Sequence, residues 1–274
     1  MRRFIIICAL AAAASSCRIQ EGNPFEPTRL GYDLSYKTVE HINRASDIVQ
    51  TLMHFNEYLA AEDEEREVLH DLYFYNYRIA ERADNRWEII GYDYTTLSVL
   101  TGGHLLDDTG DSWQFYRHST PVSSDLPTIT RMDGGQFDKF ALRMYGVFSG
   151  PAVYEYSPDL DLAFTFIPST TASDSRQETY EYIDVEGSGE IALWYTHYQA
   201  KSFTFETETP LRTRPINGRI SSVIDGALSM RIEMDGTIFT PRAEYDKYGS
   251  VKIFGGKDNA YQKSYDNEYR YFYE

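Results

Sequence analysis

Cysteine is scarce in this chain, which holds two in 274 residues, Cys8 and Cys17. Both lie among the first seventeen residues, ahead of any segment with the pattern of a folded domain. If the chain is cut between them, one cysteine remains and no internal disulfide can form, even in a compartment that permits disulfides. A single cysteine next to a new terminus, with no folded surroundings to activate its thiol, is also a poor candidate for a nucleophile.

Long hydrophobic runs are missing as well. A membrane-spanning helix needs about twenty consecutive apolar residues, and the longest such run, residues 4–14, is too short. It follows Arg2 and Arg3 and precedes the small residues Ser15 and Ser16. This order of basic head, apolar run and small residues is typical of a secretory signal peptide. We therefore predict a signal peptide over residues 1–16 and no transmembrane helix.

The segment Ala14-Ser15-Ser16-Cys17 resembles a bacterial lipobox, in which small residues precede a cysteine that receives diacylglycerol. The resemblance implies cleavage after Ser16 and acylation of the Cys17 sulfur and its new amino group. Two or more acyl chains anchor a protein stably, whereas one binds marginally. The alternative is an ordinary signal peptide followed by a chance cysteine. We expect Cys17 to be the lipid acceptor that holds the protein to an outer membrane, on its periplasmic or its external side.

Positive charge is in deficit, because 26 Lys and Arg face 42 Asp and Glu for a net charge of -16. A signal peptide would remove Arg2 and Arg3 and no acid, which changes -16 to -18. This balance argues against nucleic acid as a partner. It also argues against attraction to anionic lipid, so that the acyl anchor alone would hold the membrane. Acidity of this kind favours solubility and mutual repulsion at a crowded surface.

Motifs of common catalytic and metal sites do not occur. We find no HExxH, GxSxG, SxxK or GxxxxGK[ST] pattern. The six histidines have no metal-ligand spacing: they are His41, His54, His70, His104, His118 and His197. Carboxylates are so numerous that none stands out as the facing pair of a glycosidase. We expect no catalytic residue, no metal and no cofactor.

One acidic segment, residues 107–111 (DDTGD), offers the oxygen ligands that Ca²⁺ takes. Its acids stand at positions 1, 2 and 5 and its glycine at position 4. An EF-hand loop instead has glycine at position 6 and glutamate at position 12. We therefore interpret the segment as an acidic turn.

Aromatic residues, in contrast, are abundant at 15% of the chain, with 23 tyrosines. Tyrosine favours strands and keeps its hydroxyl in water, which suits half-exposed sheets and also a sugar-stacking surface. We expect Trp87 and Trp194 to fill the core of a sheet. Trp113, in the segment GDSWQFY, and the nearby Tyr116 are the best candidates for an exposed ligand-binding surface.

A helical period runs through the N-terminal part. Apolar residues recur at three- and four-residue steps: they are Val39, Ile42, Ile48, Val49, Leu52, Phe55 and Leu59. Ser35 is a plausible N-cap. The acidic residues 62–65 interrupt the period and suit the positive end of a second, shorter helix. We predict a lipidated tether over residues 17–34 and a helical segment over residues 35–72.

From residue 73 the apolar period changes to two, which predicts a β-rich domain over residues 73–274. Several short segments have the residues of hairpin turns: Asp84-Asn85, Gly187-Ser188-Gly189, Asn217-Gly218, Asp225-Gly226 and Asp235-Gly236. Between the last two, Leu228, Met230, Ile232 and Met234 alternate with polar residues, which indicates one buried and one wet face. The expected fold class is α+β, with N-terminal amphipathic helices followed by a predominantly antiparallel β-meander or sandwich-like domain, folded as one unit.

This layout of lipobox, tether, helices and tyrosine-rich hairpins resembles lipoproteins common in Bacteroidetes envelopes. The resemblance implies location and architecture, because many such families have no assigned activity. The leading interpretation is a non-catalytic envelope lipoprotein with a structural or interaction role and an envelope protein as partner. The alternative is a glycan-binding surface lipoprotein using exposed Tyr and Trp, which a clustered aromatic patch flanked by Asn, Asp or Gln would favour. A carboxylate hydrolase is the third and least favoured interpretation.

Overall fold

The computed structural model describes most of the chain from residue 27 onward. The described residues are 27–91, 96–107, 110–117, 127–133, 138–144, 148–149, 155–156, 158–169, 180–193, 200, 202–216, 219–248, 250–256 and 259–266. The predicted signal peptide and Cys17 lie outside them. No helix within these ranges is long and apolar enough to cross a membrane.

The first element, α2 (Pro27–Ala60), is a helix of 34 residues. At 1.5 Å per residue it is about 50 Å long. The predicted apolar period is confirmed, since Val39, Ile42 and Leu52 are completely buried. The helix ends before the acidic run, as expected, and α3 (Asp63–Tyr73) follows it.

The start of α2 differs from the prediction. Residues 27–34 are helical rather than part of a tether, and Ser35 is no N-cap. Its hydroxyl donates to the Tyr32 carbonyl oxygen at 2.8 Å from within the helix. Pro27 suits a first helical turn because it has no N–H to leave unsatisfied. Gly31, which falls within the predicted tether, lies instead where the helix packs closely on the sheet.

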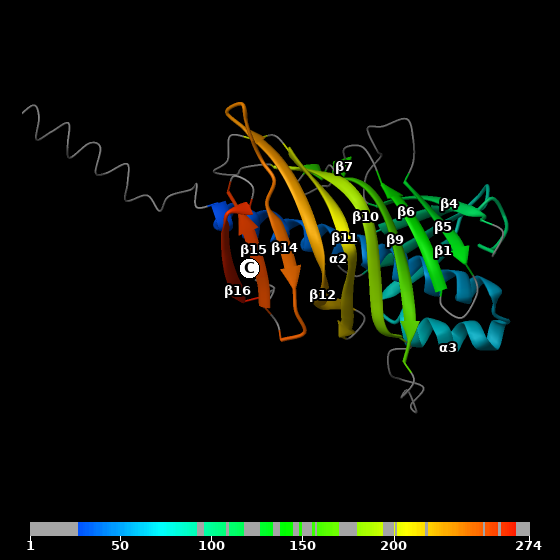
Figure 1. Ribbon diagram of the computed structural model, residues 1–274. Coiled ribbons are helices and arrows are strands. Elements are labelled where there is room, and N and C mark those ends of the chain that lie inside the picture. Colours follow the sequence, from blue (N-terminus) through cyan, green and yellow to red (C-terminus); the bar gives the residue numbers. More distant parts are fainter. Residues whose placement is uncertain are drawn as a thin grey trace, which may run out of the picture.

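Fourteen strands form one antiparallel sheet, and two short strands form a second. In chain order the strands are β1 (Tyr77–Glu81), β2 (Arg86–Gly91), β3 (Thr96–Leu100), β4 (Ser112–Arg117), β5 (Thr128–Asp133), β6 (Asp138–Met144), β7 (Phe148–Ser149), β8 (Glu155–Tyr156), β9 (Pro158–Pro168), β10 (Tyr180–Ala192), β11 (Ser202–Ile216), β12 (Arg219–Met234), β13 (Thr237–Phe239), β14 (Arg242–Tyr245), β15 (Ser250–Gly255) and β16 (Tyr261–Asp266). The long strands β9–β12 form the middle of the sheet and cross α2 (Figure 1).

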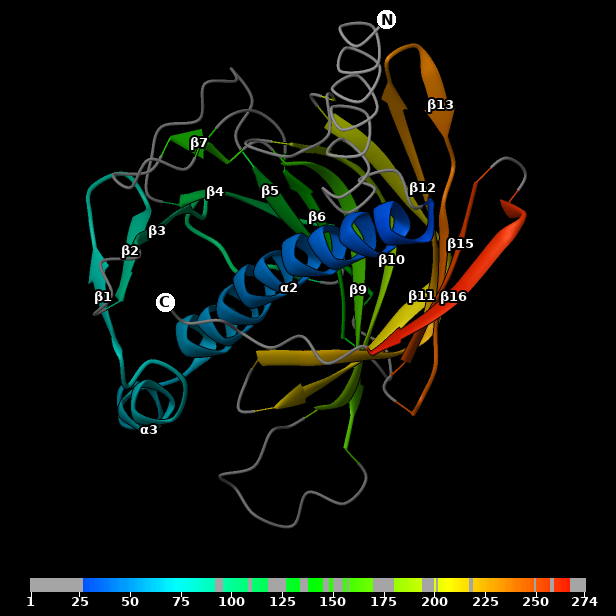
Figure 2. The same cartoon turned by 90° about the vertical axis from the view of Figure 1, so that its left-hand side faces the viewer.

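The large sheet is a meander, in which nearly every strand pairs with its neighbours along the chain. Its order is β1-β2-β3-β4-β5-β6-β9-β10-β11-β12-β14-β15-β16, with β13 pairing to β12 and β7 pairing to β8 apart from it. The sheet curves around α2, so that its first and last strands lie on opposite sides of the helix (Figure 2). The α+β class with a mainly antiparallel sheet is confirmed. Among the described elements, however, α2 rather than a second large sheet covers the concave face.

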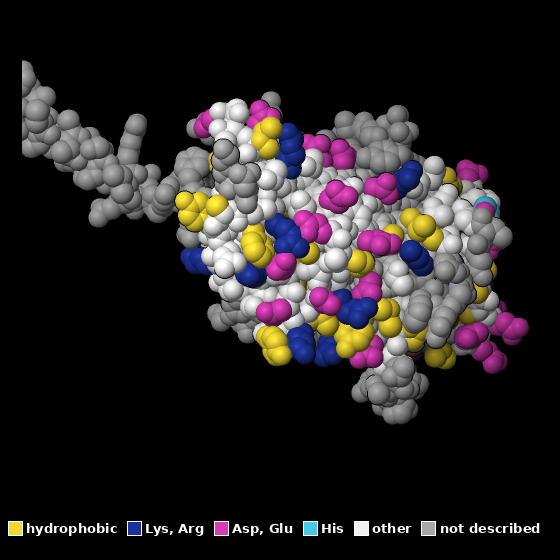
Figure 3. All heavy atoms as spheres, in the orientation of Figure 1, with side chains coloured by type: hydrophobic (Ala, Val, Ile, Leu, Met, Phe, Trp, Pro, Cys, Tyr) yellow, Lys and Arg dark blue, Asp and Glu magenta, His cyan; other side chains and the backbone are white. Residues whose placement is uncertain are grey.

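Side chains alternate between the two faces of this sheet. Leu228, Met230, Ile232 and Met234 on β12 are all buried, as predicted. Polar residues between them point to the convex face, where acids and bases lie interspersed (Figure 3). The concave face therefore forms the core with α2, and the convex face meets water.

The turn predictions had mixed outcomes. Asp84-Asn85 joins β1 to β2, with φ of 62° and 59°. Asp235-Gly236 joins β12 to β13, also at positive φ. Both predictions are confirmed, whereas Asn217-Gly218 lies outside the described residues.

Two other predicted turns lie inside long strands. Gly187 belongs to β10 and Gly226 to β12, with φ of 139° and 113°. A Cβ added at Gly187 would lie 2.1 Å from the backbone oxygen of Asp161. A Cβ added at Gly226 would lie 2.4 Å from the backbone oxygen of Pro210. The register shifts at both places, so these are β-bulges. The turn predictions were wrong because glycine at positive φ suits a bulge, which bends a strand, as well as a hairpin.

The helix also carries polar side chains into the core, and it satisfies several of them itself. Thr38 and Ser46 are buried at 0% exposure. The Thr38 hydroxyl donates to the Leu34 carbonyl oxygen at 2.9 Å, and the Gln50 amide donates to the Ser46 hydroxyl at 3.2 Å. Because these groups are paired within α2, their burial does not incur the cost of an unmade hydrogen bond.

Candidate functional site

Trp113, predicted to be exposed, is completely buried. Its side chain points inward from β4 and meets the Phe55 ring of α2 edge-on, with the ring centroids 5.5 Å apart. Trp87 of β2, predicted to be in the core, is half-buried and meets the same ring at 5.6 Å. The expectation of an exposed Trp113 was wrong because the segment GDSWQFY is a strand whose alternate residues face the core. The side chains of Tyr116 and Trp194 lie outside the described part of the structure.

The acidic segment 107–111 lies between β3 and β4 and is described in part. The Asp111 carboxylate lies 3.4 Å from His104 Nε2. Within the described ranges no three His, Cys, Asp or Glu side chains come together in a way that suits a metal ion. The loop is fastened to α2 by Asn56, whose side chain accepts from the Leu106 N–H at 3.0 Å and donates to the Leu106 carbonyl at 3.4 Å.

The environment of each histidine on α2 indicates a structural role. Burial, with smaller contributions from the nearby Arg44 and Lys37, lowers the pKa of His41 to about 3. Its imidazole is therefore neutral at physiological pH. His54 stacks on Tyr73 of α3, with ring centroids 3.7 Å apart and an interplanar angle of 10°. The two rings join the C-terminal part of α2 to α3.

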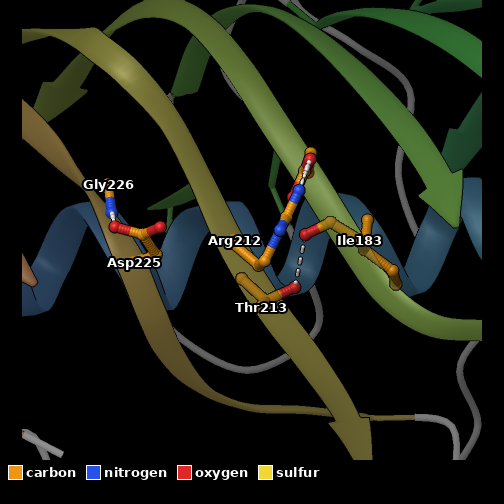
Figure 4. A network of polar contacts seen from close by, with 6 residues as sticks. Ile183, Arg212, Thr213, Asp225 and Gly226 are labelled. Atoms are coloured by element: carbon orange, nitrogen blue, oxygen red, sulfur yellow. Dashed lines mark hydrogen bonds and ion pairs between the residues drawn. The ribbon is translucent and has the colours of Figure 1, made fainter. Parts of the chain in front are cut away.

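On the convex face, Arg212 of β11, labelled in Figure 4, forms two hydrogen bonds to Asp184 of β10. Its Nε and Nη2 donate to the two carboxylate oxygens at 2.8 and 2.7 Å. The hydrogen bond to Asp184 raises the pKa of Arg212, with a smaller opposing effect of burial. Beneath it, the buried Thr213 hydroxyl donates to the Ile183 carbonyl at 3.0 Å. These contacts fasten β10 to β11 on both faces of the sheet.

A second arginine, Arg242 of β14, serves in the same way between three strands. It donates to Glu208 of β11 and to Glu244 of its own strand, and these bonds raise its pKa. Its guanidinium also lies 5.5 Å from the centre of the Phe254 ring on β15. Arg212 and Arg242 are thus engaged in holding strands together.

The most exposed tyrosines do not form a common platform. Tyr248 precedes β15, whereas Tyr261 pairs with Gly255 at its opposite end. Tyr75 lies after α3, near the C-terminal end of α2. Among the described residues there is therefore no cluster of exposed aromatic rings of the kind that would favour glycan binding.

The end of α2 carries a different kind of surface, made by α3. Arg66 of α3 fixes the two helices together, since its Nε and Nη2 donate to the Tyr58 and Leu59 carbonyl oxygens at 3.1 and 3.2 Å. These carbonyls are among the last of α2, where helix geometry leaves no intrahelical partner. Phe74, just after α3, is buried, and its ring centroid lies 6.0 Å from that of Tyr58. The α3 helix is therefore fastened firmly at one side.

The other side of α3 is open. None of its eleven residues is buried. Val68 is 64% exposed and Leu72 41%, and Tyr75, two residues after the end of α3, is 70% exposed. We call these three side chains the α3 apolar row. Six acids lie on α3 or directly before it: they are Glu62, Asp63, Glu64, Glu65, Glu67 and Asp71.

The sequence predicted the short acidic helix but gave no reason to select it as a site. Its apolar residues have the spacing of the buried face of an amphipathic helix. A helix that exposes such a row has the same sequence pattern and differs only in which of its faces packs on the rest of the protein. The role of Arg66 was also missed, although a basic side chain shortly after a helix end is the residue type that pairs with terminal carbonyls.

Comparison with known proteins gives no further guidance, because no protein-family model, curated protein or solved structure matches the chain.

Proposed function

We propose that this protein is a lipid-anchored envelope protein of the outer membrane with a non-catalytic role, the binding of another envelope protein. The observation that carries the proposal is the order of segments along the chain. A lipobox-like Cys17 follows a signal-peptide pattern, and the first described helix begins at Pro27, ten residues later. A protein made in this way would be exported, acylated and held at a membrane surface.

The short spacing restricts where the folded part can lie. Ten residues span at most about 35 Å when fully extended, so the Pro27 end of α2 would remain near the bilayer. The opposite end of α2, which carries α3, lies about 50 Å away along the helix axis. An anchored protein of this shape holds α3 at the end of α2 that is remote from its attachment.

A binding role is supported by the distribution of charge and apolar surface. On the convex face Arg212 and Arg242 tie strands to one another, whereas α3 presents exposed apolar side chains among acids. Contiguous exposed apolar residues with a polar rim are typical of a protein-interaction surface. The glycan-binding alternative has less support, since the exposed tyrosines lie apart.

The anchor can be tested with metabolic labelling by an alkyne-bearing fatty acid in an expressing bacterium. The wild-type chain is expected to take up label and to sediment with membranes, and Cys17→Ala is expected to lose both. Label or membrane association that persists in Cys17→Ala would disprove the anchor.

The face of the membrane is tested by protease treatment of intact and lysed cells. Cleavage on intact cells would place the partner outside the cell, and cleavage only after lysis would place it in the periplasm. A glycan array serves as the test of the alternative, and we expect no bound glycan. Binding that depends on the exposed Tyr248 or Tyr261 would replace our proposal with a glycan-binding role.

A further inference from the structure

The outward side of α3 is an unpartnered helix face. A helix of eleven residues is marginal in water without packing, and α3 packs through Arg66 and Tyr73 on one side. Val68 and Leu72 lie four residues apart, so they share a face, and both are exposed. The α3 apolar row is therefore not needed to attach α3 to the rest of the protein.

The charge around this row is one-sided. Between Glu62 and Asp71 the chain has six acids and a single arginine, Arg66. Acidic side chains gather at the α3 end of the molecule in Figure 3. Within the described part of the chain Glu64, Glu65 and Glu67 form no ion pair.

Acids on the sheet are in a different situation. Several of them lie beside a cation, such as Asp184 at Arg212, Asp161 at Arg143 and Glu186 at Lys139. Their charge is partly neutralised within the protein. Glu64, Glu65 and Glu67 have no such cation beside them among the described residues. The strongest complement to these charges is a set of lysines and arginines around an apolar strip.

We infer that α3 docks a cationic amphipathic segment of another envelope protein, whose apolar side chains cover Val68, Leu72 and Tyr75 and whose basic side chains face the α3 acids. This inference rests on the proposed binding role and names the chemistry of the partner. A bilayer is a poor occupant because anionic headgroups would meet the acidic rim. A second copy in a symmetric α3–α3 contact would place the same acids against each other.

The inference is tested with the full chain, purified in a mild detergent, and a synthetic helical probe. The probe has about 18 residues, five helical turns, with leucines on one face and lysines on the other. One control peptide replaces every lysine by glutamate. Another has the composition of the probe but disperses its leucines around the helix. Affinities are measured by fluorescence anisotropy at low and physiological salt.

Two pairs of variants locate the binding. Val68→Ser/Leu72→Ser removes the apolar row, and Met132→Ser/Ile238→Ser is its matched control because both residues are about half exposed on the sheet. Glu64→Gln/Glu67→Gln removes two α3 acids. Glu206→Gln/Glu233→Gln removes two exposed acids of the convex face and leaves the net charge the same as in the test variant.

We expect the lysine probe to bind and both control peptides to bind at least about tenfold more weakly. Loss of two apolar anchors is expected to weaken the probe at least about tenfold. Loss of two α3 acids is expected to weaken it several-fold at low salt and less at physiological salt, because screening reduces the contribution of exposed charges. The sheet variants are expected to stay within about twofold of wild type.

The inference is overturned if the probe does not bind, if the sheet variants weaken it as much as the α3 variants, or if dispersed leucines bind equally well. Self-association that Val68→Ser/Leu72→Ser abolishes would make the occupant a second copy. Binding to anionic vesicles that depends on the same residues would make it a membrane. The mass of the N-terminal peptide from the same preparation reports acylation of Cys17, so failure of the anchor is seen separately from failure of docking.

Discussion

The Thr207 hydroxyl on β11 accepts a hydrogen bond from the Gly187 backbone N–H on β10, at 2.9 Å. It also donates to the Gly187 carbonyl oxygen at 3.3 Å. Both residues lie where the register between the two strands shifts, between Val185 and Ser188 of β10. A backbone group that the bulge removes from the strand ladder is thus satisfied by a side chain. A bulge bends its strand, so the curvature of the sheet around α2 relies on side-chain hydrogen bonds that replace the strand hydrogen bonds lost at such bulges.

We predict that Thr207→Val lowers the free energy of unfolding by about 1–2 kcal/mol, because the Gly187 N–H is left without an acceptor while the side-chain shape is kept. Urea unfolding followed by far-UV circular dichroism measures the change. Thr204→Val, at an exposed site on the same strand, is the control and should change stability by less than about 0.5 kcal/mol. Equal effects of the two substitutions would show that the Thr207 hydroxyl does not support the bulge.

A second prediction concerns Gly187 itself. Gly187→Ala would place a Cβ 2.1 Å from the Asp161 backbone oxygen and would also force alanine into positive φ. Gly236→Ala has the positive φ but no atom within 4 Å of the new Cβ. We expect Gly236→Ala to cost about 1 kcal/mol, and Gly187→Ala to cost more than about 3 kcal/mol or to prevent folding. Similar unfolding midpoints for both variants would contradict the close approach of β9 to β10.

The contrast between these two glycines shows what the sequence could predict. Asp235-Gly236 and Asp225-Gly226 have the same residues in the same local pattern, yet the first is a hairpin turn and the second a bulge. Local conformational preference is equal for both. The difference comes from β11, which continues opposite Gly226 and keeps β12 paired beyond it. Which neighbouring strand is long enough to do so is a tertiary property.

The candidate site shows the same limit. The apolar periods of α2 and β12 were predictable because burial on one face requires them. The direction of Trp113 was not, since its neighbours in sequence are polar while its neighbour in space, Phe55, is 58 residues earlier in the chain. The open face of α3 follows from where Arg66 attaches, and a sequence pattern does not specify that contact.

The packing of α2 on the sheet gives a third prediction. Alanine is favoured over glycine in a helix by about 1 kcal/mol, so Gly31→Ala would stabilise an isolated α2. In the folded protein the new Cβ would lie 2.6 Å from Ile253 Cγ2 and 2.9 Å from Pro241 Cβ. We therefore expect a net loss of about 1–3 kcal/mol by thermal unfolding.

A double-mutant cycle with Ile253→Ala is the control for this clash. Removal of the Ile253 side chain makes room for the new methyl group, so Gly31→Ala should cost less in that background than in wild type. If Gly31→Ala instead raises the unfolding temperature of the wild-type chain, α2 does not approach β15 as closely as we describe.

His41 gives a prediction about pH. Its pKa is about 3 in the folded protein, below its ordinary value of 6.5, chiefly because of burial. As pH falls below 6.5 the unfolded chain takes up a proton at this site and the folded chain does not, so stability is lost in the window between 6.5 and about 3. The loss is about 1.4 kcal/mol per pH unit at most. His41→Gln cannot take up this proton.

Urea unfolding at several pH values compares the two chains. Between pH 7 and pH 5 the wild type should lose about 2 kcal/mol more than His41→Gln. Above pH 7.5 the difference between them should be constant, which serves as an internal control because the imidazole is neutral in both states. Parallel stability curves down to pH 5 would show that His41 is accessible to protons in the folded protein.

The attachment of α3 to α2 supplies the last prediction. Arg66 donates to two terminal carbonyls of α2 and lies over the Tyr58 ring at 5.7 Å. A cation at a helix C-terminus also interacts favourably with the helix dipole. Arg66→Met keeps much of the side-chain length and removes the donors and the charge. Because no residue of α3 itself is buried, the Arg66 bonds supply much of its attachment to α2, together with the His54–Tyr73 stack and the buried Phe74.

We therefore expect Arg66→Met to speed amide hydrogen exchange in α3 at least about tenfold, with little change in β9–β12, since local opening of a weakly packed element precedes global unfolding. Arg44→Met is the matched control, because Arg44 pairs with Glu40 on the exposed side of α2 and such surface pairs contribute about 0–1 kcal/mol. Unchanged exchange in α3 would mean that Tyr73 and Phe74 hold it without Arg66. Faster exchange throughout the sheet would mean that α3 unfolds together with the sheet as part of one cooperative core. The α3 apolar row would then be presented to a partner in a fixed orientation.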